Sequence, residues 1–175
     1  MMQANAATIV PVLGRDYSGQ NCSIARALEV VGERWTLLIL RDAFLGITRF
    51  DGFARKLGIA ENVLARRLET LTEAGILERR PYQGRRYDYV LTERGRELFP
   101  VIVSLMRWGD EHLSPDGPPA LIRHAGCGGG IAAGARCEGC GATVGPDEVE
   151  WLWGPGSGRP ERVFHPRPER AAPAA

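Results

Sequence analysis

The feature that most constrains the fold of this chain is a pair of short amphipathic segments, each of which ends at a glycine. A strand-turn-strand pattern follows the second segment. Residues 50–58 (FDGFARKLG) carry apolar side chains at helical spacing and end in a glycine. A second helix is predicted over residues 62–74 and ends at Gly75. Two helices with a short connection that contains glycine are typical of a helix-turn-helix.

The residues after Gly75 predict a β-hairpin. Residues 76–82 (ILERRPY) and 86–91 (RYDYVL) have the composition of strands, and residues 83–85 form the turn between them. A basic-tipped hairpin directly after a helix-turn-helix is a wing. The predicted fold class is therefore mainly α with a small β-hairpin (α+β), a winged helix-turn-helix.

Three further helices are expected around this unit. Residues 23–31 form one, with Ser23 as its N-cap. Residues 33–44 form another, which is apolar nearly all round and so belongs in a core or at a subunit contact. Thr92 caps a long amphipathic helix of the kind that forms dimer contacts. The apolar stripe of this last helix comprises Leu98, Val101, Ile102, Leu105 and Trp108.

The polar face of helix 62–74 contains the candidate base-reading residues. At 100° per residue, its leucines share one face, and Asn62 and Arg66 lie opposite them. In the major groove, Asn pairs bidentately with adenine and Arg with guanine. An ordinary solvated helix face is the alternative, but the preceding helix and the wing favour contact with DNA.

Basic side chains around this helix are candidates for contacts with the DNA backbone. Arg67 flanks the reading face, Arg85 and Arg86 lie at the hairpin tip, and Arg49 lies at the start of the preceding helix. Lys56 is equally consistent with a plain surface charge. Between Arg49 and Arg86, nine basic residues oppose five acidic ones, which favours a polyanionic partner.

Residues 22–80 (beginning CSIARALEVVGERWTLLILRDAF) and 87–113 (YDYVLTERGRELFPVIVSLMRWGDEHL) resemble the HxlR-type branch of the MarR-like winged-helix regulators. The resemblance implies a homodimer that packs through its first and last helices and binds a pseudo-palindromic operator in double-stranded DNA. We therefore expect a transcriptional repressor, with a small-molecule effector as a further partner. The alternative is a winged-helix module for protein assembly with no specific DNA target.

Two positions depart from the family pattern. Cys22-Ser23 stands where the family usually has Cys-Pro, and Gly84-Arg85-Arg86 stands where a wing proline is common. Some members use the cysteine that matches Cys22 as a redox sensor, because the start of a helix can activate a thiol. Cys22 is thus a candidate sensor, and an inert buried cysteine near the dimer contact is the alternative.

The other three cysteines belong to a paired motif, His124-x-x-Cys127 and Cys137-x-x-Cys140, with a glycine after each half. This spacing resembles a zinc ribbon, in which four ligands complete a closed, tetrahedral structural zinc site. Metal binding would then supply much of the folding energy of so small a module. His112 or water could replace His124, and free cysteines in a glycine-rich loop are the alternative.

The chain divides into five predicted parts. The winged domain is preceded by an arm and followed by a linker, the zinc-ribbon-like module, and a tail that is rich in Pro, Gly and Arg and expected to be disordered. In chain order these parts are residues 1–20, 21–113, 114–119, 120–153 and 154–175.

Other classes of protein are disfavoured. No apolar run approaches the ~20 residues that cross a bilayer, and no secretory signal is recognisable, so we expect a cytoplasmic protein. The sequence contains no nucleophile-base-acid set and no phosphate loop, so we expect no enzyme; His112 and His165 are interpreted as surface groups. Trp35, Phe44 and Trp108 could line an effector pocket, although core packing explains them more simply.

Overall fold

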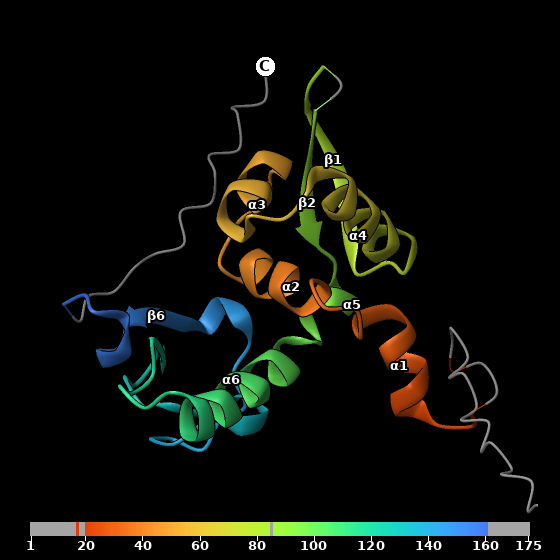
Figure 1. Ribbon diagram of the computed structural model, residues 1–175. Coiled ribbons are helices and arrows are strands. Elements are labelled where there is room, and N and C mark those ends of the chain that lie inside the picture. The colour runs from red at the N-terminus through yellow and green to blue at the C-terminus, as the bar shows by residue number, and fades with distance from the viewer. Residues whose placement is uncertain (1–16, 18–19, 85, 161–175) are drawn as a thin grey trace, which may run out of the picture.

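The computed structural model describes residues 17, 20–84 and 86–160 (Figure 1). Its first part has the expected α+β winged helix-turn-helix fold, with the wing tip, α3 and α4 at one end and α6 at the other. The elements are α1 (Ser23–Val31), α2 (Thr36–Phe44), α3 (Phe50–Leu57), α4 (Glu61–Glu73), β1 (Leu77–Gln83), β2 (Arg86–Leu91), α5 (Glu93–Arg96) and α6 (Phe99–Leu113).

The helix-turn-helix is held together by apolar side chains that face inward from both helices. Phe53 of α3 and three leucines of α4, Leu64, Leu68 and Leu71, are completely buried in one core. Gly58 ends α3 in the left-handed conformation, with φ of 60°, which side chains with a Cβ adopt at a cost. The turn can therefore bring α4 back across α3.

The wing is an antiparallel pair whose register runs from Leu77 opposite Leu91 to Gln83 opposite Arg86. The register shifts between Pro81 and Gln83, as expected where a proline cannot donate to the ladder. The base of the wing is tied to the segment before α3, because the backbone N–H of Tyr89 donates to the carbonyl of Thr48 at 2.7 Å.

Two helix starts differ from the sequence predictions. Cys22, not Ser23, is the N-cap residue of α1. Thr92 does cap a helix, because its Oγ1 accepts a hydrogen bond from the backbone N–H of Gly95 at 3.1 Å. However, the predicted single long helix is divided into α5 and α6, and Pro100 lies in the first turn of α6. Proline has no backbone N–H to donate in the interior of a helix, but it suits the first turn, where the N–H has no helical partner.

The C-terminal module consists of short strands, and β3 (Ala120–His124) pairs antiparallel with β6 (Val149–Trp153). A second antiparallel pair is formed by β4 (Ile131–Ala132) and β5 (Arg136–Cys137), with the 3-10 turn η1 (Ala133–Ala135) between them. Two further 3-10 turns are η2 (Pro146–Glu148) and η3 (Pro155–Ser157). Ile122, Ile131 and Trp151 belong to the same buried cluster as Phe99 and Ile102 of α6, so the module shares the core of the winged domain.

Residues 154–160 differ from the sequence expectation of disorder. They contain η3, whose Gly156 N–H donates to the carbonyl of Pro118 in the linker at 3.2 Å. The guanidinium of Arg159 lies 4.4 Å from the ring centre of Trp153. Backbone and cation–π contacts therefore hold the start of this segment. The rest of the predicted tail, and all of the predicted arm except residues 17 and 20, lie outside the described residues.

Within the described ranges, no helix is both long enough and apolar enough to cross a membrane.

Candidate nucleic-acid interface and metal centre

The two faces of α4 are arranged as its sequence predicts. Asn62 and Arg66 are exposed, whereas Leu64, Leu68 and Leu71 have no exposed surface. The backbone N–H of Val63 donates to the Oδ1 of Asn62 at 2.9 Å. The outer face of the helix thus presents an amide and a guanidinium one turn apart, as major-groove readout of bases requires.

Arg67 has a different environment from the one expected. Its guanidinium pairs with Glu33, in the segment before α2, at 3.0 Å, and only 15% of the side chain is exposed. This ion pair joins α4 to the segment between α1 and α2. Arg67 thus has a protein partner in the structure, and its predicted contact with a phosphate stays a prediction.

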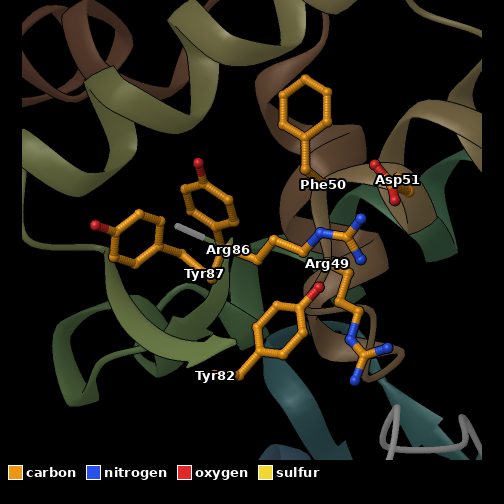
Figure 2. Close-up of a pocket in the computed structure, with 7 residues that line it drawn as sticks. Arg49, Phe50, Asp51, Tyr82, Arg86 and Tyr87 are labelled. Carbon is orange, nitrogen blue, oxygen red and sulfur yellow. The ribbon is translucent and has the colours of Figure 1, made fainter. Parts of the chain in front are cut away.

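Two basic residues, Arg49 and Arg86, line a cleft of about 290 Å³ between the start of α3 and the hairpin. Figure 2 shows Arg86 extending across this cleft toward Asp51. Arg86 itself is exposed. Arg49, the N-cap residue of α3, lies 4.6 Å from the ring centre of Tyr82 and 3.7 Å from the carboxylate of Asp88. Arg85 lies outside the described residues.

Sequence reasoning missed two of the residues that organise this region. Tyr82 and Asp88 lie on opposite strands of the wing and together fix the Arg49 side chain. An aromatic and an acidic residue stand among the arginines of the hairpin sequence, and this pattern could have indicated Tyr82 and Asp88 as partners of an arginine. Lys56, for which the sequence is equally consistent with a DNA contact and a plain surface charge, pairs with the buried Asp42 of α2 at 3.1 Å.

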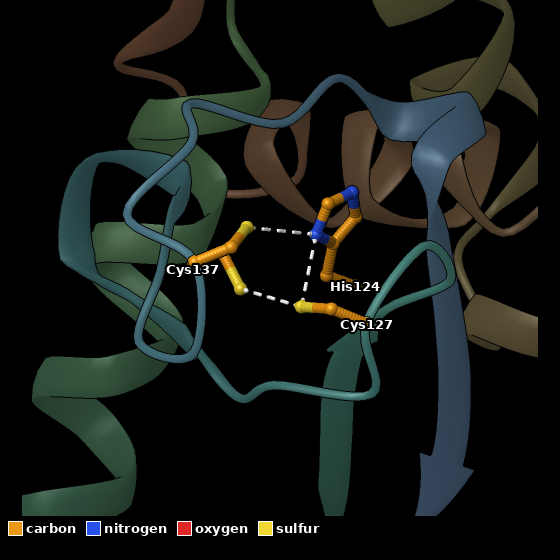
Figure 3. Close-up of side chains that lie close together, drawn as sticks. His124, Cys127 and Cys137 are labelled. Atoms are coloured by element: carbon orange, nitrogen blue, oxygen red, sulfur yellow. Dashed lines mark hydrogen bonds between the residues drawn. The ribbon is translucent and has the colours of Figure 1, made fainter.

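The paired motif of the C-terminal module forms one cluster (Figure 3). One ligand atom each from His124, Cys127, Cys137 and Cys140 lies within 4.8 Å of the other three. The Nδ1 of His124 is 3.3 Å from the Sγ of Cys127 and 3.4 Å from that of Cys140. The Sγ atoms of Cys127 and Cys137 are 3.4 Å apart. These four residues could bind a metal ion.

Backbone groups around the cluster favour a thiolate. The pKa of Cys137 is lowered to about 6, first because the backbone N–H of Cys140 donates to its sulfur, with a further contribution from the N–H of Gly139. A Cβ on Gly129 would lie 2.8 Å from the Sγ of Cys137. Glycine is therefore required where the chain passes this sulfur, and the ligand set suits a metal that prefers thiolate and imidazole.

The remaining sequence candidates lie apart from this cluster. His112 stacks with Trp108 at 5.2 Å on α6 and is not among the four clustered residues, so His124 is the histidine of the site. Cys22 is half-buried at the start of α1, and its role as a redox sensor stays a prediction. His165 lies outside the described residues.

The apolar residues weighed for an effector pocket have three different environments. Phe44 is buried and packs against Phe99, with ring centres 5.3 Å apart. Trp35 is half-buried against the same core, whereas Trp108 is 54% exposed. Core packing therefore explains Phe44, as the sequence favours. A small-molecule effector stays a prediction.

This geometry defines a winged helix-turn-helix protein with an exposed reading helix and a basic wing. Residues 30–117 match the model of the HxlR-like helix-turn-helix family. The chain belongs to this family. It is also 50% identical over 137 residues to the uncharacterized HTH-type transcriptional regulator Rv3095 of Mycobacterium tuberculosis, an alignment that covers 77% of this chain and 87% of that protein. The regulator YdeP of Bacillus subtilis is 34% identical over 57% of this chain and 83% of its own length.

A solved structure supports the same family. The structure of PA1607, described as a proposed transcription factor, matches with a TM-score of 0.60 at 36% identity and covers 73% of this chain and 92% of its own. These relatives are named as regulators or transcription factors, and the chain is a DNA-binding transcriptional regulator rather than an enzyme. The family match ends at residue 117. The alignment with the mycobacterial protein covers 137 residues, which is more than the chain has up to that point, so it includes part of the C-terminal module.

Proposed function

We propose that this cytoplasmic regulator binds a pseudo-palindromic operator as a homodimer and represses transcription by occupying it. The observation that carries the proposal is the outer face of α4, where Asn62 and Arg66 are exposed opposite a fully buried row of leucines. In the proposed complex this face enters the major groove and reads base edges.

The wing supplies the contacts to the sugar-phosphate backbone in this proposal. Arg86 is exposed and extends over the cleft beside the start of α3. Arg49 lies in the same cleft, held by Tyr82 and Asp88, and the sequence adds Arg85 at the tip. Charges placed beside the reading helix fix its register on the duplex and contribute affinity that carries no sequence information.

Exposed apolar side chains support the homodimer. Ile24 and Leu28 on α1 are exposed, as are Val101, Leu105 and Trp108 on α6. The residues of α6 recur at helical spacing and form one apolar face. An exposed apolar face of this kind is typical of a protein–protein contact, and a second copy of the chain brings the same helices to a symmetric interface.

For the metal centre, we propose a structural zinc ion. Three thiolates and one imidazole are a ligand set that Zn²⁺ binds tetrahedrally with no position open for catalysis. The purified protein should contain about one zinc ion per chain, and Cys137→Ser should lose it. A fully folded protein that contains no metal would contradict this part of the proposal.

The operator contacts are tested with a fluorescent duplex from the region upstream of the regulator's own gene, titrated at several salt concentrations. Arg66→Ala should weaken binding to the operator by about 1–3 kcal/mol and relax its sequence preference. Arg86→Ala should weaken binding to operator and unrelated duplex alike, and should reduce the salt slope by about one.

A reporter gene behind the operator tests the sign of regulation, since repression requires higher expression when the regulator is deleted. Glu111→Gln, at an exposed position of α6, is a matched control that should bind DNA as the parent does, because α6 itself lies far from the wing (Figure 1). Binding without sequence preference, or with no effect of Arg66→Ala, would contradict the operator proposal.

A further inference from the structure

One hairpin of the C-terminal module connects the metal centre with α6. The hairpin runs through β4, η1 and β5, and Cys137 is the last residue of β5. Cys127 precedes the hairpin and Cys140 follows it, so three of the four clustered ligands fix its two ends. Whatever holds these ligands together also holds the open end of the hairpin.

The same hairpin supports α6 at its open end, through Ile131, and at its closed end, through Gly134. The Nε of Arg107 donates to the carbonyl of Ile131 at 2.6 Å. The backbone N–H of Gly134 donates to the Oγ of Ser104 at 2.9 Å. Ile131 and Ala135 are fully buried and belong to the core that α6 also joins. One side of α6 is thus held by the hairpin, while its apolar side, with Leu105 and Trp108, is exposed.

Two of the three cysteines in the cluster are accessible to small reagents. Cys127 and Cys140 are exposed, whereas Cys137 is buried, and the Sγ atoms of Cys127 and Cys137 lie 3.4 Å apart. In the proposed metal-bound cluster, each cysteine sulfur is a thiolate, and an exposed thiolate next to a second thiolate is the arrangement that a two-electron oxidant converts to a disulfide. We propose that this cluster is a site of modification by peroxides, and that oxidation releases the metal and the hold of the hairpin on α6.

The reaction is balanced with hydrogen peroxide as the oxidant. The thiolate of Cys127 attacks one peroxide oxygen, the O–O bond breaks, and the leaving hydroxide takes a proton to become water. The resulting sulfenic acid is attacked by the thiolate of Cys137, which forms the S–S bond and expels hydroxide, and a second proton yields a second water. Two thiolates have lost two electrons in total, and the metal, left with two of its ligands, dissociates.

The consequence for the regulator follows from the position of the hairpin. Without metal, the open end of the hairpin is no longer fixed, and its contacts with Ser104 and Arg107 lose their support. Because α6 supplies much of the proposed dimer face, oxidation should weaken the dimer and, with it, binding to the operator. This inference rests on the proposed metal centre and homodimer.

The experiment uses the full chain carrying Cys22→Ser, so that oxidation of Cys22 affects neither the thiol count nor the binding of DNA. The protein is treated with hydrogen peroxide, and zinc release, free thiols, sedimentation and affinity for the operator duplex are measured in parallel. We expect zinc release with loss of two thiols, and dimer and operator dissociation constants raised by about tenfold or more. Reduction followed by added zinc should restore both.

Arg107→Met tests the connection through the hairpin. This variant should keep its zinc and bind the operator more weakly before any oxidation, and peroxide should release zinc with little further loss of affinity. Zinc retained in excess peroxide, or released while the dimer and operator affinity stay unchanged, would overturn the inference. If the inference fails but the reduced protein holds zinc and binds the operator, the proposed function still stands. If the reduced protein neither holds zinc nor binds the operator, the proposed function and this inference are both rejected.

Discussion

Asp42 is an acidic residue in the last turn of the apolar helix α2, and the structure buries it completely. Its Oδ1 pairs with Arg41 at 2.9 Å and with Lys56 of α3 at 3.1 Å. A buried carboxylate is costly unless it is paired. Asp42 therefore acts as a link that fixes α3, and hence the helix-turn-helix, to α2.

The first prediction concerns this link. Asp42→Asn removes the charge and keeps the shape, so it should lower the free energy of unfolding by about 1–2 kcal/mol. The cost stays moderate because Arg41 and Lys56 are about 40% exposed and can be hydrated. Urea unfolding at fixed protein concentration measures the change. Asp51→Asn, at an exposed position of α3, should change stability by less than ~0.5 kcal/mol, and an equal loss in both variants would contradict the link.

Arg67 provides the second prediction at the scale of the residue. Because its guanidinium pairs with Glu33 and is largely covered, Arg67→Ala should leave the salt dependence of operator binding unchanged. It should lower stability by up to ~1 kcal/mol, as should Glu33→Ala. Salt titrations of the two variants check this. If Arg67 instead contacts a phosphate, its variant alone will reduce the salt slope by about one.

At the scale of the element, α5 lies so close to the start of the wing that only a glycine fits. A Cβ on Gly95 would lie 2.2 Å from the carbonyl oxygen of Ile76. Thr92 reinforces the same contact, since its Oγ1 donates to the carbonyl of Gly75 at 2.6 Å. This junction determines how the wing is oriented relative to α6.

The third prediction follows from this close approach. Gly95→Ala must push α5 away from β1, so we expect a loss of about 1–3 kcal/mol in stability, as for an overpacked core. Thermal unfolding measures it. Arg94→Ala, an exposed position of the same short helix, is the control and should stay within ~0.5 kcal/mol of the parent. A Gly95→Ala variant as stable as this control would show that the junction can move freely.

The elements also show how far sequence reasoning extends. Helical periodicity and terminal glycines predicted α3 and α4, and strand composition around a turn predicted the wing, because all of these signals are local. The division between α5 and α6 was missed, although Pro100 gave a local signal for it. The contact of the zinc-ribbon-like module with α6 could not be predicted, because Arg107 and Ile131 are distant in sequence and neither residue type indicates its partner. For His124, Cys127, Cys137 and Cys140, the spacing in the sequence was sufficient to predict that the four side chains lie together, while the bound metal stays a prediction.

At the scale of the whole molecule, the surface proposed for DNA lies at one end of a connected core, and the α6 face proposed for the dimer lies at the other end, together with the metal cluster. In Figure 1 the wing, α3 and α4 lie at one end, and α6 with the C-terminal module lies at the other. The buried cluster extends from Leu64 and Leu68 on α4 through Phe99 on α6 to Ile131 in the module. A change at the dimer face can therefore alter DNA binding without any change in the reading helix.

The last prediction separates dimerisation from base reading. Leu105→Glu places a charge at the centre of the exposed apolar face of α6, where pairing with a second copy would bury it at a cost of several kcal/mol. Sedimentation should show monomers, and affinity for the full operator should fall by at least about a hundredfold, because each half-site is then bound independently. The helical signal in circular dichroism should stay unchanged, since Leu105 is exposed within one chain. Glu111→Lys on the same helix should remain dimeric, and a Leu105→Glu variant that stays dimeric would place the interface elsewhere.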